Sequence, residues 1–87
     1  MKSKLNTDVY NHKYWKLPNG DFHREDGPAI EYNNGDKDWW LNGKRHRDDG
    51  PAVERINGYK AWFLNNKMYS EQEYKKQLRL IKLKHIL

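Results

Sequence analysis

Short apolar and aromatic runs alternate with polar turn signals over the first 69 residues of the chain. Four of these signals are Asn-Gly pairs, which begin at Asn19, Asn34, Asn42 and Asn57. An Asn-Gly pair between apolar runs is the strongest short-range signal for a β-hairpin. The pattern predicts strands at residues 13–17, 21–24, 29–33, 37–42, 44–47, 52–56, 59–64 and 67–69. Connections this short predict an antiparallel meander.

The hydrophobic pattern also repeats. The motif GxxHRxDGPAxxxxxGxxxWxxN runs from residue 20 to 42 and again from residue 43 to 65, with a period of 23 residues. Partial units flank the two copies, and a fixed period of this length indicates stacked supersecondary units. In the turns EDGP and DDGP, Gly27 and Gly50 are expected to supply a positive φ.

From Ser70 the pattern changes to the helical period. Ser70 and Glu73 have the S-x-x-E spacing of a capping box, and no Gly or Pro follows, so residues 71–85 are predicted to be helical. The apolar side chains form two stripes, one of Tyr74, Leu78 and Ile81 and the other of Leu80, Leu83 and Leu87. Covering a sheet needs only one stripe, so the second predicts contact with another copy of the chain in a homodimer.

These patterns predict a mainly β protein with a C-terminal α-helix, in which an antiparallel meander of repeats over residues 1–69 is capped by a basic helix over residues 70–87. The chain has 87 residues and no cysteine, so we expect one domain with a thin core and no disulfides. Its apolar runs are far shorter than the roughly 20 residues that span a bilayer. The basic N-terminus lacks the apolar stretch of a signal peptide. We therefore expect a soluble cytoplasmic protein that does not use a membrane.

The formal net charge is +5, and the end of the chain carries most of it. Residues 1–65 contain 11 Lys and Arg against 10 Asp and Glu, whereas residues 66–87 contain six basic residues and two acidic ones. Such an excess favours polyanions or acidic proteins as partners. The basic residues expected to contact phosphates are Lys75, Lys76, Arg79, Lys82 and Lys84 on the helix, extended by Lys44, Arg45 and Arg47 on a strand.

Aromatic residues are abundant, with four Trp and six Tyr, and such rings suit both small cores and base-stacking platforms. Trp39 and Leu41 fall on one face of their strand and Trp40 on the other, so neither face of the sheet is expected to be simply solvated. Trp39 and Trp62 are expected to lie in the core. The rings that remain as candidates for stacking on bases are Trp15, Trp40 and Tyr59.

The repeated His-Arg-x-Asp-Gly segment has two interpretations, one catalytic and one structural. His23 with Asp26, or His46 with Asp49, has the residue types of a general base and its orienting carboxylate. However, the chain has no Cys, and its two serines lie near the N-terminus and at the helix cap, so no nucleophile is placed beside them. We therefore expect a turn in which Arg and Asp bridge the loop and His packs on an aromatic ring of the next unit. A small ribonuclease that uses the two histidines is an alternative.

Metal and nucleotide sites are not expected either. The four histidines are His12, His23, His46 and His85, and they lack the tight spacing of ligand pairs. Thiolate ligands are absent, so neither a metal nor another cofactor is expected. The chain also lacks the glycine-rich motifs that cradle phosphates.

The repeated motif resembles one found in small proteins of tailed phages. Its length and hairpins are similar to those of MORN repeats, although the MORN Tyr/Gly pattern is not reproduced. The strict match covers residues 20–65, about half of the chain. With the small size, the basic tail and the terminal helix, the chain resembles phage counter-defence proteins that inhibit the endoribonuclease toxin of a host toxin–antitoxin system. The resemblance implies RNA binding in the host cytoplasm and no catalytic residues.

We therefore expect a non-enzymatic protein that binds single-stranded RNA with little sequence preference and inhibits a host endoribonuclease toxin. One alternative is an inhibitor that contacts a host defence protein without RNA. Another is a small structural component of a phage.

Overall fold

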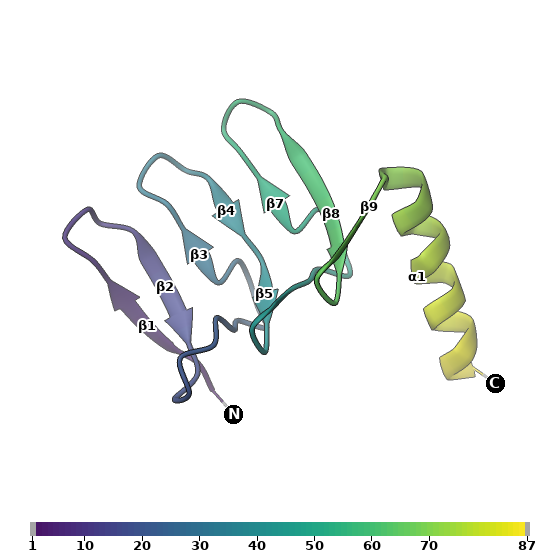
Figure 1. The fold of residues 1–87 in the computed structure, drawn as a ribbon, viewed down its shortest axis with the longest axis horizontal. Helices are drawn as coiled ribbons and strands as arrows, with labels where there is room; N and C mark the ends of the chain where they lie inside the picture. The colour runs from purple at the N-terminus through teal and green to yellow at the C-terminus, as the bar shows by residue number, and fades with distance from the viewer. Residues whose placement is uncertain (1, 87) are drawn as a thin grey trace.

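The computed structural model describes the backbone of residues 2–86 and the side chains of residues 2–84. Within that range the chain forms β1 (Lys4–Thr7), β2 (Lys13–Lys16), β3 (Ile30–Glu31), β4 (Lys37–Asp38), β5 (Trp40–Leu41), β6 (Lys44–Arg45), β7 (Val53–Glu54), β8 (Lys60–Leu64), β9 (Lys67–Tyr69) and α1 (Glu71–Ile86). Seven strands form one antiparallel sheet in the order β1-β2-β3-β4-β7-β8-β9, and β5 pairs with β6 in a separate hairpin. Figure 1 shows three hairpins side by side, with α1 at the end of the stack. The predicted fold, an antiparallel β meander with a C-terminal helix, is confirmed.

Most of the predicted strands are shorter in the structure, and two of them change in kind. The strand predicted at 21–24 is reduced to a single bridge at Phe22. The strand predicted at 37–42 is interrupted at Trp39, whose N–H donates to the carbonyl of Ala52 (2.8 Å). Because of this interruption, β4 belongs to the main sheet and β5 to the separate hairpin.

The Asn-Gly pairs form two kinds of tight turn. In the three-residue turn between β3 and β4, the N–H of Tyr32 donates to the carbonyl of Asp36 (2.9 Å) and Gly35 has a φ of 99°. In the two-residue turn between β5 and β6, Asn42 and Gly43 have φ values of 51° and 77°. Two consecutive positive φ values are the requirement of a type I′ turn, which matches the twist of the flanking strands.

Asparagine takes the place of glycine in two further turns. Asn65 and Asn66 have φ values of 50° and 73° between β8 and β9, and Asn11 has a φ of 67° between β1 and β2. Asn is the residue other than Gly that most readily adopts this conformation. The turn before β2 contains no Asn-Gly pair, and this missing signal explains why β1 was not predicted.

Residues that lie opposite one another in neighbouring strands form rows across the sheet, one of them buried and the next one charged. Ile30, Asp38, Val53 and Ala61 lie opposite one another in successive strands and form a buried row. The next row alternates in charge, and its members are Lys13, Glu31, Lys37, Glu54 and Lys60. Opposite charges directly across a strand pair stabilise a sheet modestly and fix its register.

The core between units is thin and consists largely of small side chains. Ala29 and Ala52 are fully buried, and their carbonyls accept hydrogen bonds from the N–H groups of Trp15 and Trp39 at 2.8 Å. The core residues are Ala29, Ile30, Ala52, Val53, Ala61, Leu64 and Tyr74. Because the side chains of Ala29 and Ala52 are small, successive units lie close enough to form backbone hydrogen bonds with each other.

Helix α1 closes the stack at its C-terminal end. Its N-terminus is capped as predicted, because the N–H of Glu73 donates to the Ser70 hydroxyl (3.2 Å). Tyr74 is buried, its hydroxyl donates to the carbonyl of Arg47, and the N–H of Gly50 donates to the same hydroxyl (3.2 Å). The helix therefore occupies the place where a further repeat would cover the second turn, as terminal caps do in other repeat proteins.

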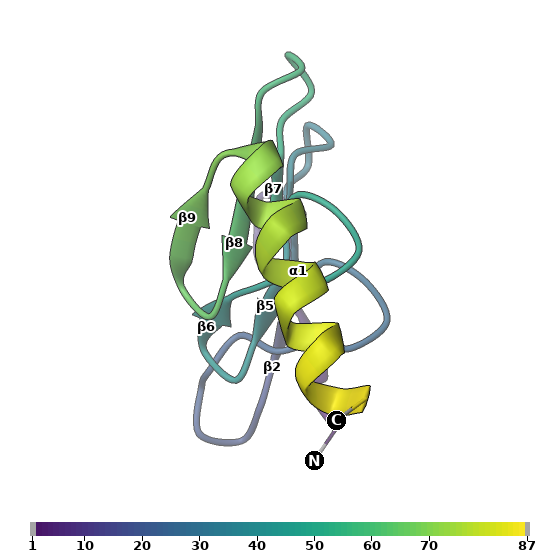
Figure 2. The same ribbon diagram turned by 90° about the vertical axis from the view of Figure 1, so that its right-hand side faces the viewer.

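Only the first half of α1 packs on the sheet. The helix contacts β8 and β9, and Tyr74 is buried and Leu78 half-buried, whereas every side chain from residue 79 to 84 is exposed. Figure 2 shows the helix crossing the end of the stack in front of β8. The predicted stripe of Tyr74, Leu78 and Ile81 is thus only partly buried, because Ile81 lies beyond the sheet. Leu80 and Leu83 of the other stripe are exposed, and Leu87 lies outside the described residues.

Within residues 2–86, the structure contains no helix whose length and hydropathy would allow it to cross a membrane.

We expect Tyr74→Ala to lower the free energy of unfolding by about 3–5 kcal/mol, because the change removes a buried ring and its two hydrogen bonds. Urea unfolding followed by tryptophan fluorescence measures this loss. Leu83→Ala is the matched control on the same helix, since that side chain is 54% exposed, and should cost less than about 0.5 kcal/mol. Similar losses in the two variants would contradict the capping role of Tyr74.

Candidate nucleic-acid interface

The repeated turns hold an arginine between a tryptophan ring and a glycine. The guanidinium carbon of Arg47 lies 3.9 Å from the centre of the Trp39 ring, and that of Arg24 lies 3.8 Å from the centre of the Trp15 ring. On the other side of Arg47, a Cβ atom added to Gly50 would approach the guanidinium carbon to 3.0 Å. The same distance is found for Gly27 and the first arginine.

The expectation that Gly27 and Gly50 supply a positive φ is wrong. The glycines with positive φ in the described part of the chain are Gly20, Gly35, Gly43 and Gly58. Glycine suits this position in the repeated turn because an added Cβ would crowd the guanidinium, which would have to shift by a few tenths of an ångström. Close approach, rather than backbone conformation, explains why this glycine recurs.

The donors of each guanidinium are used within its own turn. Arg47 donates to Asp49 (2.8 Å), to the carbonyl of Pro51 (3.0 Å) and to Glu54 (3.0 Å). Arg24 makes the equivalent bonds, and its hydrogen bond and charge lower the pKa of Asp26. The Arg–Asp bridge predicted for this turn is present. In Arg47, which we expected to contact phosphate, Nε and Nη1 donate bonds within the chain, and one face of the guanidinium lies on the Trp39 ring.

The histidines of the repeat tie each unit to the next. The backbone N–H of Asn42 donates to Nδ1 of His23 (2.9 Å), and that of Asn65 donates to Nδ1 of His46 (3.0 Å). Each bond spans 19 residues and reaches the type I′ turn of the following unit. Because Nδ1 accepts, the proton of a neutral ring lies on Nε2. The predicted packing of His on an aromatic ring is thus replaced by a backbone hydrogen bond.

The predicted acid–base pairs do not form in the described structure. Asp26 bonds to Arg24 instead of His23, and the carboxylate nearest to Nε2 of His23 is that of Glu25, at 3.5 Å. Asp49 likewise bonds to its arginine. Among the residues that the structure describes, no group of three or more His, Asp or Glu side chains could hold a metal ion. The side chain of His85 lies outside the described residues.

Open hollows beside the two repeated turns have acidic rims. Their volumes are about 480 Å³ and about 390 Å³. The first is lined by Trp15 and His23, and the second by Trp39 and His46. The exposed carboxylates around them are Glu25, Asp26, Asp48 and Asp49. These exposed carboxylates repel phosphate, so the hollows do not favour a polyanion.

Helix α1 presents the basic surface predicted from the sequence. All five of its predicted contact residues are exposed, namely Lys75, Lys76, Arg79, Lys82 and Lys84. Lys75 forms an ion pair with Glu71 (3.4 Å), and the other four make no ion pair with any residue that the structure describes. From residue 79 to 84 the helix lacks acidic residues. This half of the helix is therefore an uncompensated cationic surface that projects beyond the sheet.

The second basic cluster is less exposed than the helix. Lys44 is exposed, but the guanidinium of Arg45 lies 5.0 Å from the Trp40 ring and 5.4 Å from the Phe63 ring, and 3.5 Å from the carboxylate of Asp38. Arg47 also bonds within the chain, so Lys44 is the most exposed member of this cluster.

The rings proposed for stacking differ in their availability. Arg24 covers one face of Trp15, and Arg45 and Phe22 approach Trp40, whereas Tyr59 is exposed at a hairpin tip. The expectation that Trp39 and Trp62 form the core is wrong, because both are only half-buried. Two of the three predicted platforms therefore already have partners within the chain.

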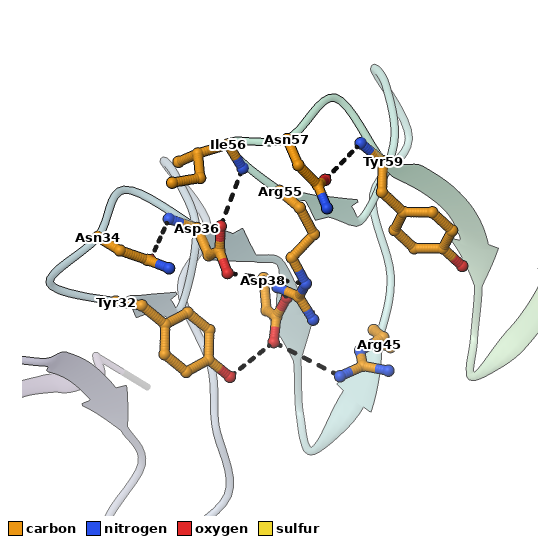
Figure 3. Close-up of polar contacts among 9 residues, drawn as sticks. All are labelled: Tyr32, Asn34, Asp36, Asp38, Arg45, Arg55, Ile56, Asn57 and Tyr59. Atoms are coloured by element: carbon orange, nitrogen blue, oxygen red, sulfur yellow. Dashed lines mark hydrogen bonds and ion pairs between the residues drawn. The ribbon is translucent and has the colours of Figure 1, made fainter.

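A buried ionic network, which we did not predict, lies at the centre of the sheet. Figure 3 shows Asp38 between Tyr32, Arg45 and Arg55. Its carboxylate is fully buried and accepts hydrogen bonds from Arg55 (2.8 Å) and from the Tyr32 hydroxyl (3.0 Å). Burial, followed by the negative charge of Asp38, raises the pKa of the Tyr32 hydroxyl.

Comparison of the two repeats carries the signal for this network. Its members stand where the copies differ, since Tyr32 corresponds to Arg55, Asp38 to Ala61 and Phe22 to Arg45. We call the contact between successive repeat units a joint. Residues needed at every joint recur in both copies, whereas a contact made once requires different residues in the two copies. Three of the differences between the repeats thus meet at one place in space.

We expect Gly50→Ala to destabilise the protein by about 1 kcal/mol, because the added Cβ would press the guanidinium of Arg47 against the Trp39 ring. A double-mutant cycle with Arg47→Ala, measured by urea unfolding, isolates this collision. Gly50→Ala should cost little once the guanidinium is absent. Strictly additive losses would contradict the packing role of the glycine.

Stability should fall at alkaline pH. The pKa of Tyr32 is raised above the ordinary value of 10.0, so the stability that its neutral form contributes is complete below pH 10 and is lost as the pH rises through the folded-state pKa. Urea unfolding at pH 9 to 11.5 should show a smaller loss in Tyr32→Phe than in the parent protein. Tyr59→Phe, at an exposed ring, should leave the profile unchanged, and equal profiles in all three proteins would contradict the assignment.

Comparison with models of known protein families finds no match. Comparison with curated proteins finds none either. No solved structure matches the fold. The functional interpretation therefore rests on the exposed basic helix and on the resemblance of the repeated motif.

Proposed function

We propose that this protein binds single-stranded RNA without catalysis and that helix α1 is the main contact surface. The observation that carries the proposal is the half-helix from residue 79 to 84, which is exposed and basic and contains no acidic residue. Phosphates attract Lys and Arg through a sequence-independent interaction that dominates non-specific binding.

The arrangement of charges on the helix suits an extended strand. Lys75, Arg79 and Lys82 recur at i, i+4 and i+7, so they lie along one side of the helix over about 10 Å. Glu71 pairs with Lys75 near the N-terminus, which leaves the strongest field at the C-terminal half. Lys76 and Lys84 flank this line on the helix surface.

The limited number of free rings favours binding with little base preference. Trp15 and Trp40 already contact arginines of the chain, and Tyr59 lies at a hairpin tip. Recognition would therefore depend mostly on the phosphate backbone, and only weakly on stacking. The basic helix, fixed to the sheet by Tyr74, presents its charges from a rigid support.

The inhibitory role in the proposal rests on the resemblance of the repeated motif. Bound RNA would bring the protein to a host endoribonuclease toxin in the host cytoplasm, and the complex would block the toxin. The alternative is RNA-independent contact with a host defence protein through the exposed apolar residues of the helix, Leu80 and Leu83. Nuclease treatment of the complex separates the two, because contact without RNA survives it.

Fluorescence anisotropy of a labelled single-stranded RNA at several salt concentrations tests the proposal. We expect tight binding at low salt that weakens steeply as salt rises. Each phosphate neutralised on a single strand contributes about 0.7 to the logarithmic salt slope, so the triple variant Lys75→Gln, Arg79→Gln and Lys82→Gln should flatten the slope by about 2.

A matched control removes the same charge from the other end of the molecule. Lys2, Lys4 and Lys13 are all exposed and lie at the β1–β2 end, and their replacement by Gln lowers the net charge by the same amount. The control should retain most of the affinity. Equal losses in the two triple variants would place the interaction in the overall charge rather than on α1. Absence of RNA binding by the parent protein would overturn the proposal.

A further inference from the structure

Three hairpin tips form one edge of the molecule, which we call the tip row. It consists of residues 8–12, 32–36 and 55–59. Figure 1 shows the three tips side by side at the edge opposite the β5–β6 hairpin. Exposed apolar side chains occupy the two outer tips, with Val9 at 92%, Tyr10 at 69%, Ile56 at 67% and Tyr59 at 55% exposure. The middle tip is polar and contains Asn33 and Asn34.

Hydrogen bonds lock the three tips to one another. The N–H of Asn33 donates to Nδ1 of His12 (2.9 Å), and its side-chain amide donates to the carbonyl of Tyr10 (2.9 Å). On the other side, the N–H of Ile56 donates to the carboxylate of Asp36 (2.9 Å), as Figure 3 shows. The row is therefore ordered before it meets a partner, and pre-organisation reduces the entropy that binding costs.

The exposed apolar residues are not required by the turns that carry them. Asn and Gly form the turn in both copies, whereas Asn33 corresponds to Ile56 and Asp36 to Tyr59. Single exposed apolar residues are ordinary on a protein surface. Here two occur on each outer tip of a rigid edge. In the second copy these two are Ile56 and Tyr59, and the first copy has polar residues at both positions.

The tip row is nearly neutral in a chain of net charge +5. Its charged residues are Asp8, Asp36 and Arg55. Asp8 accepts bonds from the N–H groups of Tyr10 and His12, and Arg55 donates to the buried Asp38. Two copies of this edge can therefore approach without the repulsion that opposes contact between two basic helices.

We propose that the protein forms a homodimer in which two tip rows dock about a two-fold axis near the middle tip. The symmetry places Val9 and Tyr10 of each copy against Ile56 and Tyr59 of the other, so that apolar ends meet apolar ends and the Asn-rich middle tips meet each other. An isologous interface requires this kind of self-complementary surface. The row is also rich in Tyr and Asn, which combine rigid contact area with adaptable hydrogen bonds.

This location differs from the expectation that the helix mediates the dimer. The exposed half of α1 carries Arg79, Lys82 and Lys84 without acidic residues, so two such helices repel each other. Figure 1 shows the C-terminal half of α1 pointing away from the tips, so docking at the tip row leaves the basic surface free. Three five-residue tips are fewer than the roughly 20–30 residues a side of a standard interface, so we expect a dissociation constant in the micromolar range.

Sedimentation velocity from about 1 µM to about 1 mM, which brackets a micromolar constant, tests the proposal on the full chain. We expect a reversible monomer–dimer equilibrium. Val9→Lys combined with Ile56→Lys places like charges together twice across the two-fold axis and should weaken the dimer more than tenfold. Val9→Lys combined with Ile56→Asp places opposite charges together and should restore it.

Leu80→Lys combined with Leu83→Lys on the helix is the control and should leave the equilibrium unchanged. Circular dichroism confirms that each variant folds, since the substituted tip side chains are mostly exposed. A monomer over the whole range, a dimer lost only in the helix variant, or failure of the charge exchange to restore association would each overturn the proposal. A monomer whose tip variants lose toxin inhibition would assign the row to another protein instead.

Discussion

Every joint between repeats depends on an arginine guanidinium packed between a tryptophan ring and the Cα of a glycine. Arg24 and Arg47 occupy this position against Trp15 and Trp39. A cation on an aromatic face is stabilised by the ring quadrupole. While stacked on the ring, the planar guanidinium can still donate hydrogen bonds from its edges. Those donors bind carboxylates and a proline carbonyl of the same turn. The interaction thus accounts for the Arg, Asp, Gly and Trp of the motif together.

The sequence predicts features that short stretches of chain determine. The hairpins follow from Asn-Gly pairs and the helix start from the Ser70–Glu73 box, because both signals act within a few residues. The availability of Arg45 and Arg47 could not be predicted, since their partners depend on how units stack. For the same reason the sequence identified the basic residues of the helix and the strand, but not which of them bond within the chain.

Residues that both copies share and residues that only one copy has serve different structural roles. The joints use residues present in both copies, whereas the Asp38 network and the apolar tips use residues present in one. A buried carboxylate beside two arginines costs desolvation energy that an alanine would not, as the corresponding Ala61 illustrates. What it supplies is specificity, because it holds Tyr32 of one unit and Arg55 of the next in a single register.

The nearest-neighbour character of the joints also bears on how such a chain can change in length. Each histidine and each arginine contacts only its own unit and an adjacent one. In a duplicated copy of residues 43–65, inserted directly after the original, the arginine would pack on the tryptophan of the preceding unit, as it does in the existing copies. The helical cap would cover the other side of the new unit. Gene duplication can therefore lengthen the sheet by whole units, and it would increase the separation between the first hairpin and the basic helix without altering either.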